Sequence, residues 1–364
     1  MIRNEEQVVF ALRSLYQKFG YSQFKMSRFE EYDLYVRNKD FLVSDEVITF
    51  TDHTGRLLAL KPDVTLSIIK NTVDGDGSVQ KVYYNENVFR VAKGTHSFKE
   101  IMQAGLECIG DLGDYEIAEV VLLAAKSLAL IREDHVLDLS HMGLVAAMLA
   151  DCGLSEEGKA KALSIIYQKS AHELSALSAE EDLSSQAAEK LHLLCSACGA
   201  PGAVLAALAP MLRTEEEKTA FAEFSALCEI LQESGFGKNI RLDFSVGNDM
   251  KYYSGVVFKG YIEGIPAGVL SGGQYDKLLQ KMGRKSGAIG FAVYLDLLER
   301  MNKEHPEFDV DILLLCDEAA DAKAIVKAVE ELQSEGSVLV ARERPEDLRC
   351  RKVLKWTEGG LQNG

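Results

Sequence analysis

The sequence predicts an α+β protein in which an antiparallel sheet is flanked by helices. Residues 81–110 are typical of two long strands joined by a polar loop. Residues from about 146 to 236 are instead rich in Ala, Leu, Glu and Ser and carry helix breaks without strand patterns. A strand, an amphipathic helix and a second strand follow in residues 307–364, which predicts a small C-terminal α/β unit. We therefore expect one domain over residues 1–303, including the helical segment, and a second over 307–364.

The charge balance argues against nucleic acid as the main partner. The 364 residues include 40 Lys and Arg against 56 Asp and Glu, which gives a formal net charge of -16. Proteins that grip phosphates usually present a basic surface, so tRNA is not expected as the main partner. No apolar run approaches the roughly 18 residues that a membrane-spanning helix needs, and the polar N-terminal residues lack a signal-peptide core. The odd number of cysteines, seven, indicates a reducing cytoplasm rather than a disulfide framework.

The N-terminal part is predicted to hold a helix, a hairpin and a second helix. The first helix is expected from Glu5 to Phe19, with apolar side chains at helical spacing. Residues 47–60 are typical of a hairpin with a tight polar turn. Asp63 precedes a helix that starts at Thr65, where a carboxylate can cap free backbone N–H groups. Capping is therefore a structural alternative to a binding role for Asp63.

The strand pair at residues 81–110 combines charged side chains with a glycine on one face. Because strand side chains alternate with period two, Gln103, Gly105 and Glu107 share one face of the second strand. Arg90 lies at the end of the first strand, and a guanidinium can take a carboxylate in bidentate fashion. Glu107 and Gln103 can take an ammonium group or a ring N–H. The pattern indicates a zwitterion site, and the alternative is a structural hairpin with one solvated face.

Cys195, Cys198 and His192 are close in the sequence, but we expect no metal there. A zinc site needs about four ligands, and no second Cys or His pair lies nearby. The three residues also fall in a helical pattern, in which their side chains would not converge. We interpret the two cysteines as buried thiols.

Segments in a fixed order resemble the catalytic core of histidyl-tRNA synthetases, from Met1 to Met301. They are LKPDVT (60–65), VFR (88–90), QAGLECIG (103–110), KYYSGVVF (251–258), GGQYDKLL (272–279) and GAIGFAVYLDLL (287–298). The resemblance implies a class II aminoacyl-tRNA synthetase-like fold, which is an antiparallel sheet flanked by helices.

At four positions the chain lacks the side chains with which an active synthetase binds ATP and histidine. Ala92 stands in place of the motif 2 glutamate, and Leu297 in place of the motif 3 arginine. Asn248 replaces the arginine before the two tyrosines, and Lys251 replaces its acidic neighbour. Adenylation needs cations on the triphosphate, and one lost electrostatic contact costs on the order of a hundredfold in rate. We therefore expect no catalytic residues and no intrinsic aminoacylation.

The positions that line the histidine pocket of synthetases are better kept. They are Asp63, which replaces a glutamate, Thr65, Arg90, Gln103, Glu107, Tyr252 and Tyr253. The resemblance implies that Arg90 pairs with the carboxylate of a bound histidine. Glu107 and Gln103 would then take its ammonium or imidazole group, and the two tyrosines would wall its ring.

A chain that holds histidine without activating it resembles the regulatory subunit of ATP phosphoribosyltransferase, a synthetase paralogue. The resemblance implies that the chain is required by the short catalytic subunit in the first step of histidine biosynthesis and confers feedback control by histidine. It also implies a hetero-octamer with that subunit, a homodimer of this chain, a cytoplasmic location and no cofactor. About 58 residues follow Pro306, fewer than the complete anticodon-binding domain of a synthetase.

Three alternatives remain open from the sequence. One is an active or divergent histidine–tRNA ligase. Another is a synthetase relative that acts on a different carrier or regulates a different enzyme. The third is a scaffold that joins the catalytic subunit without binding histidine.

Overall fold

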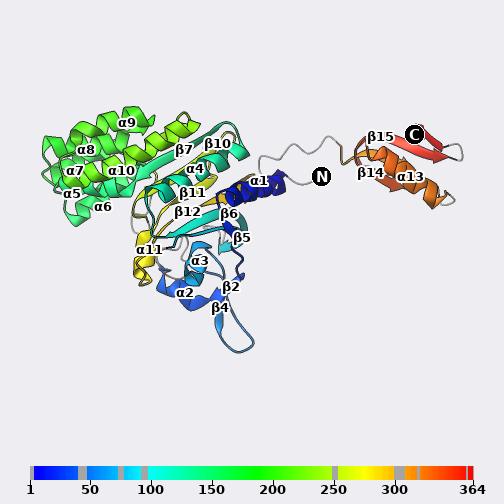
Figure 1. Cartoon of the computed structure of the whole chain (residues 1–364), viewed down its shortest axis with the longest axis horizontal. Helices are drawn as coiled ribbons and strands as arrows, with labels where there is room; N and C mark the ends of the chain where they lie inside the picture. The colour runs from blue at the N-terminus through cyan, green and yellow to red at the C-terminus, as the bar shows by residue number, and fades with distance from the viewer. Residues whose placement is uncertain are drawn as a thin grey trace. The chain divides into compact units, whose positions relative to one another are not determined.

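The computed structural model describes residues 4–39, 47–72, 78–91, 97–247, 253–298, 308–317, 320–357 and 360–363. The chain divides into two compact units, residues 1–299 and 300–364 (Figure 1). Each unit has its own sheet and its own buried apolar core.

A nine-stranded sheet forms the centre of the first unit, in the order β1-β5-β6-β12-β11-β10-β7-β9-β8. Its strands are β1 (Ser22–Gln23), β5 (Gln80–Val91), β6 (Phe98–Gly110), β7 (His135–His141), β8 (Cys198–Gly199), β9 (Ile240–Asp243), β10 (Val256–Ile262), β11 (Leu270–Gln274) and β12 (Gly287–Tyr294). The pairings are antiparallel except for β1 with β5 and β7 with β9. The predicted α+β fold, an antiparallel sheet flanked by helices, is confirmed.

Two long helices, α1 (Asn4–Lys18) and α4 (Asp114–Ile131), pack together against this sheet (Figure 1). The α4 residues Val120, Ala124 and Leu128 are wholly buried, because they recur at helical spacing on the face that meets the strands. The Tyr16 hydroxyl of α1 forms a buried hydrogen bond of 3.0 Å with the Ser127 hydroxyl of α4.

Smaller elements pack against a second core of the first unit. They are β2 (Phe29–Glu31), β3 (Thr49–Thr51) and β4 (Leu57–Leu60), which form a sheet in the order β2-β4-β3, with the helices α2 (Tyr32–Arg37), α3 (Thr65–Asn71) and α11 (Asp276–Lys281). A short helix, α12 (Leu295–Leu298), packs against β6 instead. The hairpin expected over residues 47–60 is β3–β4. Ala59 and Ile68 are fully buried in one core with Tyr84 of β5 and Leu278 of α11, so this core joins the small sheet, α3 and the large sheet.

Six α-helices form the helical segment beyond the β7–β9 edge (Figure 1). They are α5 (Met142–Asp151), α6 (Glu156–Gln168), α7 (Leu174–Glu180), α8 (Ser185–Ser196), α9 (Pro201–Leu208) and α10 (Glu215–Leu231), with short turns of helix at Ala171–Glu173, Ala209–Met211 and Gln232–Phe236. The segment begins at Met142 rather than near residue 146. Lys169 and Asp182 adopt left-handed conformations, with φ of 54° and 49°, and so separate helices at places where no glycine or proline marks a break.

The interpretation of two buried thiols is wrong for one cysteine. Cys195 lies buried in α8, but Cys198 is exposed in β8, where its thiol lies 3.4 Å from Asp243. Among the residues that the structure describes, no three His, Cys, Asp or Glu side chains are grouped to hold a metal ion. Within that same part of the chain, every helix is too short or too polar to cross a membrane.

The second unit contains β13 (Val310–Leu315), α13 (Ala322–Leu332), β14 (Val338–Ala341), β15 (Cys350–Thr357) and β16 (Gly360–Asn363). The strands follow the order β14-β13-β15-β16, and β13 pairs in parallel with β14, as a β-α-β unit requires. The last two strands were not predicted, because charged and polar residues interrupt their apolar residues. Leu354 of β15 nevertheless packs against Ile312 and Leu314, while the neighbouring Lys352 and Lys355 are exposed.

Candidate functional site

The strand register places the predicted polar residues on one face of the large sheet. In the β5–β6 hairpin, Glu86 lies opposite Gln103 and Arg90 lies opposite Lys99. Residues directly opposite each other point to the same face, so Arg90 shares a face with Gln103 and Glu107. Gln103 and Glu107 are both buried. The alternative of a hairpin with one solvated face is therefore wrong for this stretch of β6.

The Glu107 carboxylate is buried, with 2% of the residue exposed, and both of its oxygens accept hydrogen bonds. Thr65 Oγ1 donates to Oε1 at 2.8 Å, and the Tyr275 hydroxyl donates to Oε2 at 2.5 Å. Burial raises the pKa of the carboxyl group to about 8, although the two hydroxyl donors act in the opposite direction. A ligand group beside Glu107 that is cationic or carries an N–H would favour the charged form of the Glu107 carboxyl group.

Two glycines leave space on this face. Gly290 of β12 lies opposite Glu107, and a Cβ atom at Gly290 would overlap the Glu107 carboxylate. Gly273 of β11 lies opposite Gly290, and a Cβ atom there would lie 2.7 Å from the ring of Tyr253. The ring of Tyr253, predicted to line the histidine pocket, therefore lies against Gly273, in the same row of opposed residues as Gly290 and Glu107.

The start of α3 links Glu107 to the other end of the face. Arg90 lies four residues after Glu86, the residue opposite Gln103. The two are therefore about 13 Å apart along the strand. The Arg90 Nε donates to the Pro62 carbonyl at 3.0 Å. Burial raises the pKa of the neighbouring Asp63 carboxyl group, and the positive charge of Arg90 acts in the opposite direction but more weakly. Thr65, two residues after Asp63, bonds to Glu107.

Asp63 has a structural role in this arrangement. Its Oδ1 accepts a hydrogen bond of 2.9 Å from the backbone N–H of Leu66 in the first turn of α3. This is the capping interaction that the sequence offered as the alternative to ligand binding. Any ligand contact of Asp63 would be made in addition to the cap.

A buried lysine neutralises the second carboxylate of the face. Lys61 Nζ donates to Glu86 Oε2 at 3.0 Å, and Lys61 is wholly buried. Burial lowers the pKa of the Lys61 ammonium, and the paired Glu86 acts in the opposite direction. Glu86 thus pairs with an internal cation, whereas the donors to Glu107 in the described part of the chain are both neutral hydroxyls.

Sequence reasoning missed Lys61 and Tyr275 as part of this site. Tyr275 could have been found by alternation, because it lies two residues after Gly273 and so continues the same strand face. Lys61 carried no such signal, because its partner Glu86 is 25 residues away in the sequence.

Tyr252, Asn248, Lys251 and Ala92 lie outside the described residues. Leu297, which stands where synthetases have the motif 3 arginine, lies half-buried in α12.

Comparisons of the sequence point to one family. A family model described as histidyl-tRNA synthetase matches residues 1–298. The ATP phosphoribosyltransferase regulatory subunit of Oceanobacillus iheyensis is 27% identical over 298 residues, covering 80% of this chain and 72% of its own. The protein of the same name from Moorella thermoacetica is 30% identical over 335 residues, covering 90% and 85%.

Comparisons of the structure agree. A crystal structure named as an ATP phosphoribosyltransferase regulatory subunit/histidyl-tRNA synthetase, from Bacillus halodurans C, superposes with a TM-score of 0.76 at 26% identity, covering 92% of this chain and 88% of that one. A chain of an ATP phosphoribosyl transferase complex from Thermotoga maritima gives 0.63 at 18% identity, covering 80% and 97%. The second likeness shows the fold alone. The chain therefore belongs to the histidyl-tRNA synthetase family, has its class II fold, and lies within the branch of ATP phosphoribosyltransferase regulatory subunits.

Proposed function

We propose that this chain is the non-catalytic regulatory subunit of an ATP phosphoribosyltransferase, located in the cytoplasm. In this role it is required for the activity of a short catalytic subunit and confers feedback inhibition by histidine. The proposal rests chiefly on the buried Glu107 carboxylate, which is held by two hydroxyl donors on a glycine-lined sheet face in a chain of this family.

In the proposed site, histidine is the effector. Arg90 takes its carboxylate, and Glu107 with Gln103 takes its ammonium or imidazole group. Tyr252 and Tyr253 wall the ring, and Asp63 and Thr65 complete the pocket from the start of α3. A charged hydrogen bond in a buried site contributes about 1.5–3 kcal/mol, which is sufficient for Glu107 to dominate recognition.

The proposal excludes adenylation by this chain. Ala92, Asn248 and Leu297 are uncharged, whereas a triphosphate requires cationic groups around it. A histidine bound at Glu107 would therefore remain unreacted, as an effector must.

An apolar sheet face supports self-association of the chain, within a hetero-octamer with the catalytic subunit. Phe29 and Phe50 are 51% and 37% exposed, and their rings stack edge to face with centroids 5.4 Å apart. Leu58 and Leu60 of β4 lie opposite Phe50 and Phe29 and point to the same face. A second copy of the chain would remove this surface from water.

The test is a mixing experiment with a short catalytic subunit from the same source. Formation of phosphoribosyl-ATP is measured for each protein alone and for the mixture, with and without histidine. We expect the mixture to be faster than the catalytic subunit alone and to be inhibited by histidine. An unchanged rate with unchanged inhibition would contradict the proposal.

Calorimetry tests the pocket itself. Glu107→Gln is expected to weaken histidine binding by about 1.5–3 kcal/mol, the contribution of a buried charged hydrogen bond. Glu100→Gln, at an exposed position of the same strand, should leave the affinity unchanged. Equal affinities of Glu107→Gln and the wild type would show that histidine binds elsewhere, and no binding to the wild type would favour a scaffold.

The second candidate is a histidine–tRNA ligase, because the family model that matches residues 1–298 carries that description. Histidine-dependent exchange of pyrophosphate into ATP distinguishes the two functions. We expect no exchange, and exchange above background would favour the ligase.

A further inference from the structure

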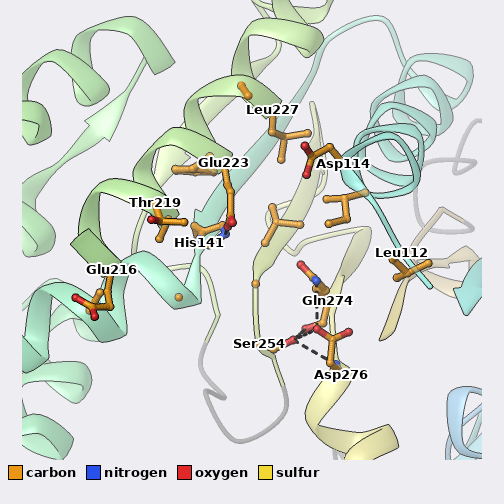
Figure 2. Close-up of a pocket in the computed structure, with 18 of the residues that line it drawn as sticks. Leu112, Asp114, His141, Glu216, Thr219, Glu223, Leu227, Ser254, Gln274 and Asp276 are labelled. Carbon is orange, nitrogen blue, oxygen red and sulfur yellow. Dashed lines mark hydrogen bonds and ion pairs between the residues drawn. The ribbon is translucent and has the colours of Figure 1, made fainter. Parts of the chain in front are cut away.

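A cavity of about 640 Å³ lies between α10, the first turn of α4 and the ends of β7 and β11 (Figure 2). It contains none of the residues predicted to bind histidine. Gln274, which lines it, is adjacent in β11 to Gly273 and so points to the opposite face of the sheet from the Glu107 site. The cavity, termed here the α10 groove, is therefore a second candidate site.

The lining of the α10 groove is strongly acidic. It includes Asp114, Glu215, Glu216, Glu223 and Asp276, and among the described residues neither lysine nor arginine lines it. Two of these acids have internal partners, because Glu215 pairs with Lys218 and Asp276 accepts hydrogen bonds from Ser254 and Gln274. Three carboxylates remain, those of Asp114, Glu216 and Glu223. Figure 2 shows Asp114 and Glu223 on different walls of the groove, from α4 and α10.

A buried histidine is aimed into the same space. His141 ends β7 and is 8% exposed, and its Nδ1 accepts the backbone N–H of Leu144 at 3.0 Å. Burial lowers its pKa to about 4, so at neutral pH the ring is uncharged and carries its proton on Nε2. Nε2 lies 4.0 Å from Glu223 Oε2, too far for a hydrogen bond. Within the described part of the chain, this donor has no acceptor.

The floor of the α10 groove is apolar. Its residues include Ile117, Ala220, Phe224, Leu227 and Val256. On α10 the lining residues Glu216, Thr219, Glu223 and Leu227 recur at three- and four-residue spacing, so they form one continuous helix face.

The carboxylates, the His141 donor and the apolar lining together indicate what kind of molecule binds in the α10 groove. Carboxylates require a cation, the His141 Nε2–H requires an acceptor, and the floor requires apolar atoms. A protonated polyamine offers donors but no acceptor, and an anion is repelled. A polypeptide segment with a lysine or arginine satisfies all three, because it also supplies backbone carbonyls and an aliphatic stem.

We propose that the α10 groove is the docking site for a segment of the catalytic subunit that carries a lysine or arginine beside apolar side chains. The inference rests on the proposed function, which supplies the partner. The cation lies beside Glu223, a backbone carbonyl of the segment accepts from His141 Nε2, and apolar side chains cover Phe224 and Leu227.

The experiment compares two charge reversals on the same helix. Glu223→Lys reverses a groove carboxylate, and Glu229→Lys reverses an exposed carboxylate of α10 outside the groove. Affinity for the catalytic subunit is measured by calorimetry, with far-UV circular dichroism to verify folding. We expect Glu223→Lys to weaken binding at least tenfold and Glu229→Lys to change it less than twofold. His141→Asn, which keeps a capping oxygen and loses the Nε2 donor, should weaken it about fivefold.

The outcomes separate this inference from the proposed function. If the wild type binds the catalytic subunit and Glu223→Lys binds equally well, docking occurs elsewhere and only the inference is wrong. If the wild type does not bind the subunit, both are wrong. If spermidine binds the wild type but not Glu223→Lys, while the subunit binds both equally, the α10 groove takes a small cation and the inference is wrong.

Discussion

At the scale of single residues, Glu107 is distinguished by its environment rather than by its position in a strand. Its carboxyl group is buried over Gly290, and its donors among the described residues are the hydroxyls of Thr65 and Tyr275. Among the described residues no cation pairs with Glu107, whereas Lys61 pairs with Glu86, so ionisation of Glu107 without a ligand is costly. This cost is what a bound ammonium or imidazole can offset.

The buried carboxyl group makes stability depend on pH. Its pKa is about 8 in the folded chain and about 4.3 in an unfolded one, so between these values the folded state holds a proton that the unfolded state has lost. Stability contributed by this group therefore falls as pH rises through that window. Relative to Glu107→Gln, which cannot ionise, the wild type should lose up to about 1.4 kcal/mol per pH unit.

The measurement is the free energy of unfolding of both proteins between pH 5 and pH 8, in the absence of histidine. Gln is close in shape to the protonated acid, and the hydroxyls of Thr65 and Tyr275 can rotate to suit its amide. Parallel pH profiles for the two proteins would mean that Glu107 is already ionised in the folded state.

At the scale of elements, the helical segment is held together by a buried ion triad. Lys190 of α8 donates to Asp151 at the end of α5 at 2.6 Å and to Glu217 of α10 at 2.5 Å. Lys190 and Glu217 are almost wholly buried. Glu217 Oε2 also accepts the backbone N–H of Thr214, which caps the first turn of α10. The triad thus sets the position of α10, and with it one wall of the α10 groove.

Removing the cation of the triad should destabilise the first unit strongly. Lys190→Met keeps the apolar stem but leaves the buried Glu217 and the partly buried Asp151 without this cation, which costs about 3–5 kcal/mol. Lys218→Met, which removes an exposed partner of Glu215, should cost about 0.5 kcal/mol or less. Denaturant unfolding followed by far-UV circular dichroism compares the two, and similar midpoints would show that the triad contributes little.

At the scale of the whole molecule, the two units have separate cores. Leu314, Leu332 and Leu354 pack together in the second unit, whereas the core around Ile68 and Tyr84 lies entirely in the first. Trp356, the single tryptophan of the chain, packs against the core of the second unit. Its fluorescence therefore reports one unit, while most helical circular dichroism comes from the other.

The separate cores predict separate unfolding transitions. Lys190→Met should lower the midpoint seen by circular dichroism and leave the Trp356 fluorescence midpoint unchanged, because Lys190 belongs to the first unit. Leu314→Ala should do the reverse, since a buried leucine truncation costs about 2–5 kcal/mol. If both variants shifted both signals equally, the two units would be unfolding as one.

Much of the fold and part of the site followed from the sequence, because they depend on local periodicity. The alternation in residues 81–110 placed Gln103 and Glu107 on one face of the second strand, and the strand register adds Arg90 to that face. The helical composition before residue 236 predicted helices, although left-handed Lys169 and Asp182 divided them in places without a glycine or proline signal. The strands β15 and β16 were missed, because charged exposed positions obscured the one buried Leu354.

The kind of structure and the available chemistry follow from the amino-acid sequence, since periodicity, caps and turn residues act over a few positions. Which groups are paired depends instead on the folded chain. It bound Glu86 to Lys61, left Glu107 with neutral donors, and brought His141 from the end of β7 to face Glu223 of α10. The physical reason is that burial and pairing depend on contacts between residues far apart in the chain, and these set the charge state on which binding depends.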